Sequence, residues 1–213
     1  MSSAQSQATR AAILDAALRL LEQDGYHAVG LGAVGREAGV SRQAIYLHFA
    51  SKANLLKALV DALNEKCVFP AFERCGVWES ASGLEALDAW VDVIAITTPP
   101  ILAVVNAVDV ARRSDPEAEA MWRRPMRGRY ADCLRIASWL AEDGVLAPGW
   151  DPPDAARFLW ATTSVRFFED LTSHGWSRSR YVRHLRRSLR AALTVSPGDD
   201  DGETRADDQF PTA

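Results

Sequence analysis

Apolar residues recur along most of the chain at the intervals that place side chains on one face of an α-helix. Ile13, Ala17, Leu20 and Leu21 follow this spacing in the first segment, and residues 56–63 repeat it. No segment shows the strict alternation typical of a half-buried strand. The pattern predicts an all-α fold of about nine helices, over residues 9–24, 31–38, 42–49, 51–63, 84–94, 101–108, 116–143, 153–172 and 177–194.

Proline and glycine mark the predicted ends of these helices. Pro99 and Pro100 are predicted to separate the fifth helix from the sixth, and Pro125 to kink or split the seventh. Residues 70–83 have a mixed composition and are predicted to form a loop. Gly175 is predicted to close the eighth helix.

The composition is that of a soluble globular protein, with 48% hydrophobic and 24% charged residues in a chain of 213. The most apolar run, residues 101–105, is far shorter than the roughly 20 residues of a membrane span. Residues 1–10 are polar and lack the apolar core of a signal peptide. We therefore expect a cytoplasmic protein with no membrane partner.

Charge is distributed unevenly around a formal net charge of −4. Residues 1–57 carry six basic and four acidic side chains, whereas residues 197–213 carry six acidic ones and a single arginine. The segment 196–213 has few apolar residues and is predicted to be a disordered acidic tail. Because the N-terminal region is only mildly basic, affinity for DNA would have to come from well-placed contacts and from dimerisation.

Nothing in the sequence predicts catalysis, a metal site or a cofactor. Cys67, Cys75 and Cys133 are not spaced as metal ligands, and no two histidines stand four residues apart. Residues 30–35 match the G-x-G-x-x-G pattern of dinucleotide-binding proteins, but a helix rather than a strand precedes them. We expect no catalytic residue and no cofactor, and an enzyme is the less favoured interpretation.

Residues 34–49 have the pattern of a helix-turn-helix. Gly39 permits a sharp turn between two short helices, and Ile45 and Phe49 form the inner face of the second helix. The residues left for DNA at the outer face and leading end of that helix, and just beyond it, are Ser41, Arg42, Gln43, Ala44, Tyr46, Leu47, His48 and Lys52.

The side chains suit this task. Arg42 and Gln43 are predicted to read bases, because arginine pairs well with guanine and glutamine with adenine. Tyr46, His48 and Lys52 are predicted to hold phosphates. Two short helices joined by a glycine are also common in helical proteins, so the pattern alone leaves DNA binding and ordinary helix packing both open.

Residues 9–63 resemble the N-terminal domain of the tetracycline-repressor (TetR) family of bacterial regulators. The resemblance rests on residues 37–41, on the Ile-Tyr-Leu-His-Phe sequence of residues 45–49, and on Ser51 and Lys52. It implies an all-helical protein with a three-helix DNA-reading head and a ligand-binding, dimerising body. Members commonly repress transcription until a small molecule binds.

The resemblance implies three parts: a helix-turn-helix domain over residues 1–50, a ligand-binding and dimerisation domain over residues 51–195, and the tail over 196–213. Gly30 stands where the family usually has a capping threonine, and Gly35 where it usually has alanine. These two departures predict a less rigid second helix.

The second half of the chain resembles the family more loosely, through residues 144–146 and 151–156. The resemblance implies that the last two long helices pair with those of a second copy. The implied interface comprises Phe158, Thr162, Val165, Glu169, Tyr181, Leu185 and Leu189. These residues could instead pack within their own subunit. The arginines of residues 178–190 form either a solvated face or a second nucleic-acid surface.

Seven tryptophans are many for this length. Several fall on the helices that surround the ligand pocket in the family, and ordinary core packing is the alternative for each. The predicted ligand-binding residues are Trp90, Asn106, Trp122, Met126, Trp160, Thr163 and Phe167. Asp109 and Arg166 are further candidates for polar anchors.

The sequence thus predicts a ligand-responsive transcriptional regulator that binds double-stranded DNA. We expect a repressor that binds a palindromic operator as a homodimer and is released by a largely apolar or aromatic small molecule. The alternative is a helical adaptor or an activator without small-molecule control.

Overall fold

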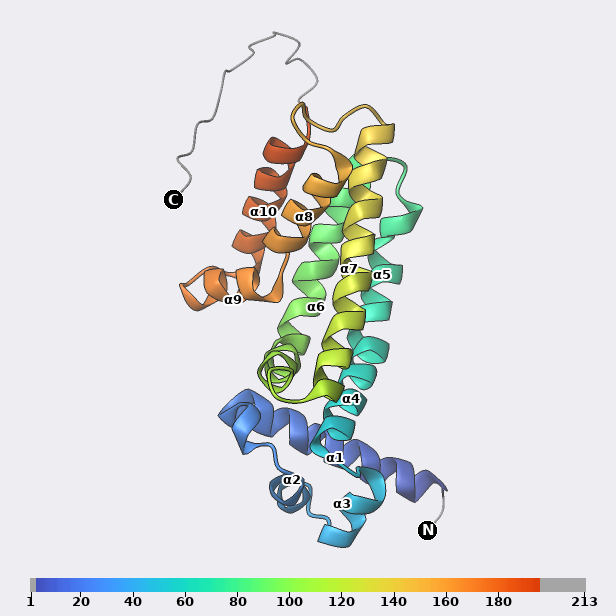
Figure 1. Ribbon diagram of the computed structural model, residues 1–213, viewed down its shortest axis with the longest axis vertical. Coiled ribbons are helices and arrows are strands. Elements are labelled where there is room, and N and C mark those ends of the chain that lie inside the picture. The colour runs from blue at the N-terminus through green and yellow to red at the C-terminus, as the bar shows by residue number, and fades with distance from the viewer. Residues whose placement is uncertain (1–2, 196–213) are drawn as a thin grey trace.

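The computed structural model describes residues 3–195, and these residues form an all-α protein, as predicted (Figure 1). The α-helices of this part of the chain are α1 (Ser3–Asp24), α2 (Leu31–Glu37), α3 (Arg42–His48), α4 (Lys52–Leu63), α5 (Phe69–Cys75), α6 (Gly83–Ala111), α7 (Pro116–Glu142), α8 (Pro152–Thr162), α9 (Val165–Ser173) and α10 (Arg178–Leu193). Shorter helical turns are η1 (Tyr26–Ala28), η2 (Asn64–Val68) and η3 (Val77–Glu79). The predicted acidic tail lies outside the described residues.

Helices α1 to α3 form a small head at one end of the molecule (Figure 1). Ile13 of α1, Val34 of α2 and Ile45 of α3 are fully buried together with α4 residues. Helix α1 lies across the head and also contacts α6. The head is therefore joined to the rest of the chain through α4 and α1.

The body is built around two long helices, α6 and α7, which lie side by side (Figure 1). Helices α8 and α10 cover one side of this pair, and α4 and α5 lie on the other. Trp90 of α6 and Leu140 of α7 are fully buried in the core of the body. This arrangement places the central helix α6 against almost every other part of the chain.

The predicted break at Pro99 and Pro100 is wrong, because both prolines lie inside α6. They remove the backbone donors that would bond the carbonyls of Ala95 and Ile96. The helix continues because packing on both sides of the prolines outweighs this local cost, and its last turns lie at a steep angle to the rest (Figure 1). Pro125 likewise lies within an uninterrupted α7.

Three further boundaries differ from the prediction. Helix α1 begins at Ser3 and not at residue 9. The predicted helix over 153–172 is divided into α8 and α9, because the hydroxyl of Ser164 accepts a hydrogen bond from Phe167 N at 3.2 Å and caps a new helix. The predicted loop over 70–83 is largely α5 and η3, joined at Gly76 with φ +60°.

Helix α6 contains an apolar 18-residue window, of mean hydropathy 1.8, that is long and apolar enough to cross a membrane. Half of that window is buried inside the protein. The helix also supplies residues to both hydrophobic cores, for example Val91 in the body and Val104 in the core that includes the head.

Candidate DNA interface and effector cavity

The turn between α2 and α3 is fixed by local hydrogen bonds. Gly39 adopts φ +67°, and Val40 N donates to Gly35 O at 2.9 Å across the turn. The hydroxyl of Ser41 accepts a hydrogen bond from Ala44 N at 3.1 Å and caps α3. Ile45 anchors the inner face of α3 in the core. Ser41 is thus engaged in positioning the helix.

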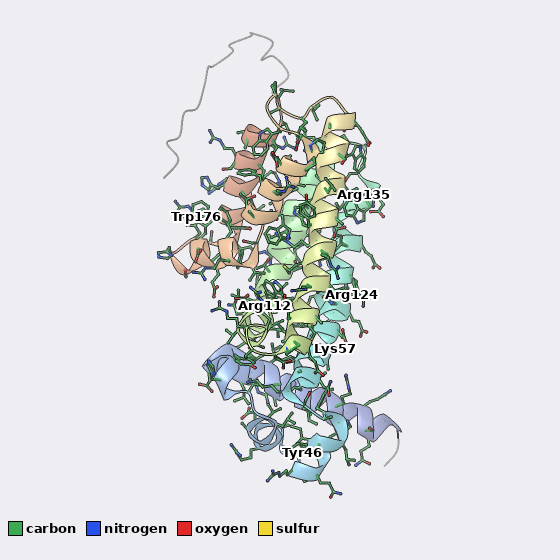
Figure 2. All side chains as sticks on the ribbon, in the orientation of Figure 1. Tyr46, Lys57, Arg112, Arg124, Arg135 and Trp176 are labelled. Atoms are coloured by element: carbon green, nitrogen blue, oxygen red, sulfur yellow. The ribbon has the colours of Figure 1, made fainter. Side chains whose placement is uncertain are left out.

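The outer face of α3 is open to solvent. Leu47 is 77% exposed and Tyr46 is 48% exposed, although both are large apolar side chains. Figure 2 shows Tyr46 at the end of the head, away from the body. Arg42 and Gln43 are exposed as well, and the Arg42 guanidinium lies 5.8 Å from the centre of the Tyr46 ring. An exposed face of arginine, glutamine and unpartnered apolar groups is what base contact in a major groove requires.

Lys52 already has partners in its own chain. Its Nζ donates a 2.6 Å hydrogen bond to the carbonyl oxygen of Tyr26 and lies 3.4 Å from the centre of the Tyr26 ring. Burial lowers the pKa of this ammonium from its usual value. The contact joins the start of α4 to the segment after α1, and the phosphate role of Lys52 stays a prediction.

The two glycines that depart from the family pattern both have room for a side-chain Cβ. Gly30 is the N-cap of α2 and offers no side chain to the helix. Gly35 is buried, and a Cβ there would lie 3.6 Å from Ile45 Cγ2, an ordinary van der Waals distance. Neither glycine is required by close packing, and the lower rigidity of the second helix stays a prediction.

A cavity of about 450 Å³ lies in the body, between α4, η2 and α5 on one side and α6 and α7 on the other. Its wall is mostly apolar and includes the aromatic rings of Phe69, Phe72, Trp78, Trp90 and Trp122. Four predicted ligand-binding residues line it, namely Trp90, Trp122, Met126 and Thr163. This volume and lining are typical of a small-molecule site.

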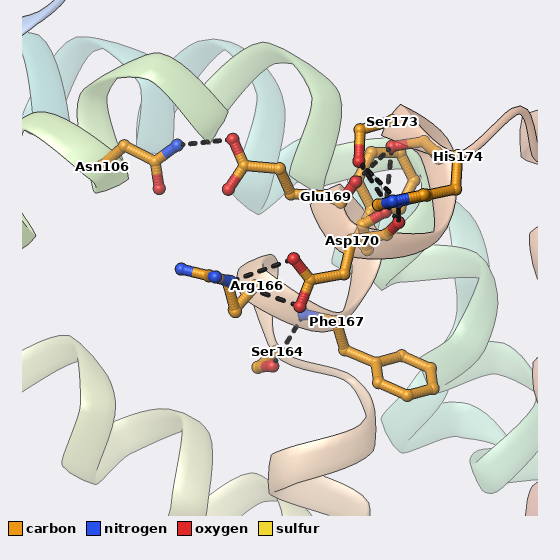
Figure 3. A network of polar contacts seen from close by, with 10 residues as sticks. Asn106, Ser164, Arg166, Phe167, Glu169, Asp170, Ser173 and His174 are labelled. Carbon is orange, nitrogen blue, oxygen red and sulfur yellow. Dashed lines mark hydrogen bonds and ion pairs between the residues drawn. The ribbon is translucent and has the colours of Figure 1, made fainter.

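Three other predicted ligand-binding residues do not line this cavity. Asn106 Nδ2 donates a 3.0 Å hydrogen bond to Glu169 Oε1 and ties α6 to α9 (Figure 3). Trp160 and Phe167 pack against the core of the body. The tryptophan count could not separate core rings from cavity rings, because both kinds lie on the same helices.

The cavity also has polar groups that the sequence prediction missed. Arg129 and Asp132 of α7 both line it. Arg129 follows Trp122 and Met126 at helical spacing, so the face that placed those two residues could have revealed it. Arg129 Nη2 donates to Trp160 O at 2.6 Å and to Thr163 Oγ1 at 2.7 Å.

Known bacterial regulators resemble this chain in sequence. Residues 13–59 match the family model described as bacterial regulatory proteins, tetR family. The transcriptional regulator UidR of Escherichia coli K12 is 32% identical over 200 residues, which cover 90% of this chain and 96% of UidR. The chain belongs to the TetR family.

Two other relatives match only a part of this TetR-family chain. AcrR of Shigella flexneri is 46% identical over 55 residues, and TtgR of Pseudomonas putida is 44% identical over 61. These alignments span 26% and 29% of the two relatives.

Solved structures share the fold of the whole chain. A transcriptional regulator from Saccharomonospora viridis, solved in complex with choline, has a TM-score of 0.72 at 24% identity and covers 89% of this chain and 100% of its own. NalD of Pseudomonas aeruginosa, the secondary repressor of the MexAB-OprM multidrug efflux pump, has a TM-score of 0.66 at 22% identity and covers 90% of this chain and 98% of its own. The relatives and solved structures named here are transcriptional regulators rather than enzymes, and this TetR-family chain shares the fold of the solved structures over most of its length.

The predicted dimer interface of this TetR-family chain is only partly available to a partner. Tyr181, Leu185 and Leu189 are at most 5% exposed and belong to the core of their own subunit. These three residues therefore pack within their own subunit, which was the alternative to a contact with a second copy. The phenol of Tyr181 has no hydrogen-bond partner within residues 3–195, and burial raises its pKa.

The other predicted interface residues are half-buried and have contacts of their own. Phe158 lies 5.2 Å from Trp150 between ring centres, and Thr162 Oγ1 donates to Phe158 O at 2.8 Å. Val165 lines the cavity, and Glu169 is bonded to α6. Their role in dimerisation stays a prediction.

Proposed function

We propose that this regulator is a repressor that binds a palindromic operator as a homodimer and is released by a largely apolar or aromatic small molecule. The observation that carries the proposal is the position of α4. Val60 and Leu63 of α4 line the cavity, and the same helix begins at Lys52, with three residues between it and the end of α3. A molecule in the cavity therefore contacts the helix that supports the DNA-reading head.

The ligand releases the repressor from its operator if the cavity has one shape in the DNA-binding state and another in the ligand-bound state. A molecule that packs between α4 and the Pro125 region of α7 displaces α4 and changes the separation of two heads in a dimer. A ligand shifts such an equilibrium only through its different affinity for the two states, and a few kcal/mol are enough.

The homodimer is inferred from the size of one head. A single α3 has seven residues and reads only half of a two-fold site, so two copies are needed for a palindrome. We assign the DNA-binding role to residues 1–50 and the effector and dimer roles to residues 51–195. A reader of chromosomal DNA of this kind acts in the cytoplasm.

The proposal is tested with DNA from the upstream region of the protein's own gene in an electrophoretic shift experiment. The wild-type protein is expected to shift this DNA, and a compound that raises its melting temperature is expected to release it. A Val105→Phe variant narrows the cavity and should bind DNA but lose the response to the compound.

The matched control is Val110→Phe, on the same helix but exposed and outside the cavity. It should respond as the wild type does. A compound that binds tightly yet leaves DNA affinity unchanged would contradict ligand control, and an activator or adaptor without such control would then be favoured.

A further inference from the structure

Arg129 is held at the wall of the cavity by neutral oxygen atoms alone. Its Nη2 donates to the backbone oxygen of Trp160 and to the hydroxyl of Thr163. Thr163 Oγ1 also accepts from Trp90 Nε1 at 3.3 Å and donates to Leu159 O at 2.6 Å, so this hydroxyl has no capacity left. The guanidinium is therefore fixed in position, while its Nε and Nη1 make no hydrogen bond to another described residue.

The charge of Arg129 is not balanced by an ion pair. Each salt bridge among residues 3–195 involves other cations, and no carboxylate oxygen lies within 4.0 Å of the Arg129 guanidinium. Burial lowers the pKa of this group, although an arginine remains charged at neutral pH. Arg129 is half-buried, and a partly buried charge without an ion-pair partner is costly, so a counter-ion at this point would stabilise the protein.

A further unsatisfied donor lies beside Arg129, on a residue that does not itself line the cavity. The indole nitrogen of Trp160 is buried and has no hydrogen-bond partner among residues 3–195, and the ring of Trp160 is centred 5.5 Å from Arg129 Cζ. Buried polar groups normally have a partner, and an unpaired indole N–H calls for an acceptor. This region thus has donors in excess of acceptors.

Among the described residues, the only carboxylate on the cavity wall is that of Asp132, one turn further along α7. It makes no ion pair with another described residue, and it interacts electrostatically with two cations, Arg135 and Arg129. Burial raises the pKa of this carboxyl and so disfavours its charged form. Arg135 itself lies 4.1 Å above the Trp78 ring. Arg135 does not line the cavity, so the charged side chains of α7 on its wall are the cation Arg129 and the carboxyl of Asp132, whose charged form is disfavoured by burial.

We propose that the effector of this cavity carries a carboxylate that binds the guanidinium of Arg129, joined to an apolar body that fills the remaining space. The inference rests on the proposed function, because it names the chemical class of the same effector. Arginine suits the role, since a charge-assisted hydrogen bond to a carboxylate is stronger than one between neutral groups. The aromatic wall then receives the apolar part of the molecule.

Three probes with the same ten-carbon chain test the charge of the head group: decanoate, 1-decanol and decyltrimethylammonium. Their affinities are measured with the full chain by tryptophan fluorescence and calorimetry, below the concentrations at which they aggregate. Decanoate is expected to bind at least about tenfold more tightly than decanol, since a hydrogen bond to a charged group contributes more than 1.4 kcal/mol.

Two variants locate this preference. Arg129→Gln should reduce decanoate binding about tenfold or more while it leaves decanol binding nearly unchanged. Asp132→Asn should strengthen decanoate binding and weaken that of the cation, because it removes the negative charge from the same wall. Arg124→Gln, on the exposed side of α7, should leave all three affinities as in the wild type (Figure 2). Decanol binding and the melting temperature show whether each variant remains folded.

The outcomes separate this inference from the proposed function. Equal affinities for decanoate and decanol would overturn the carboxylate proposal and leave an apolar effector in place. Tighter binding of decyltrimethylammonium, lost in Asp132→Asn, would overturn it in favour of a cationic effector. Failure of all three probes to bind the wild type would contradict both the carboxylate proposal and the apolar cavity as an effector site.

Discussion

Lys52 Nζ donates a hydrogen bond to the carbonyl oxygen of Tyr26 across 26 residues of sequence, and the same ammonium lies over the Tyr26 ring. The bond joins the first turn of α4 to the segment that links α1 to α2. The position of the DNA-reading head relative to α4 depends on this contact, and α4 also borders the cavity.

Replacing Lys52 by methionine is expected to lower the free energy of unfolding by about 1–3 kcal/mol, because the charged hydrogen bond and the cation–π contact are both lost. Chemical denaturation measures the loss. Lys57→Met is the control on the same helix, where an exposed ion pair with Asp61 is worth only about 0.3–0.5 kcal/mol.

The same variant distinguishes a structural role from a phosphate contact. If Lys52 acts through Tyr26, the salt dependence of DNA binding keeps its slope in Lys52→Met. An unchanged stability together with a slope reduced by about one would instead assign Lys52 to a DNA phosphate.

Gly35→Ala should raise the free energy of unfolding by about 0.5–1 kcal/mol. An alanine gains helix propensity in α2, and its Cβ would meet Ile45 Cγ2 at an ordinary 3.6 Å. Gly39→Ala, four residues away, should destabilise the head because Gly39 adopts φ +67°. Thermal unfolding of both variants checks the prediction, and a destabilised Gly35→Ala protein would show that α2 packs more tightly than described.

Gly83→Ala should destabilise the body by about 1–3 kcal/mol, because overpacking forces a shift of backbone. A Cβ at Gly83 would lie 2.7 Å from Leu140 N and 2.8 Å from Trp139 C, where the start of α6 meets the end of α7. Gly128→Ala is the matched control within α7, since nothing lies within 4 Å of its Cβ. Equal stability of the two variants would contradict the close contact of α6 and α7.

Leu47→Ala should weaken specific DNA binding while changing stability by less than about 0.5 kcal/mol. Leu47 is 77% exposed, so its side chain contributes little to folding, but it can contact a thymine methyl group in the major groove. Fluorescence anisotropy with a bound sequence, beside a melting curve, measures both effects. Unchanged DNA affinity would place Leu47 away from the groove.

The sequence predicted the head well because its signals are local. Ser41, Gly39 and the apolar spacing of Ile45 act within a few residues, so α3 and its exposed face could be read directly. The boundaries in the body depended on distant packing. Helix α6 passes through Pro99 and Pro100 because the core holds both of its halves, which no local rule indicates.

The polar residues of the body illustrate the same limit. Asn106 and Arg129 both lie on long helices. The helical spacing from Trp122 and Met126 indicates the cavity face for Arg129, but no local signal indicates which neighbour Asn106 faces. Asn106 faces Glu169 of α9, whereas Arg129 faces the cavity. The start of α9 at Ser164 could have been predicted from the sequence. Serine is a typical N-cap residue, and its hydroxyl here accepts a hydrogen bond from the backbone N–H of Phe167, three residues later.

Selection of bound sequences from a random pool of DNA tests the central claim most directly. The wild-type protein is predicted to enrich an inverted repeat, and Arg42→Ala should lose the preference at one base pair of each half-site at a cost of about 1–3 kcal/mol. The account would be contradicted if the wild type enriched no sequence, or if Arg42→Ala and Gln43→Ala enriched the same repeat as the wild type with equal affinity.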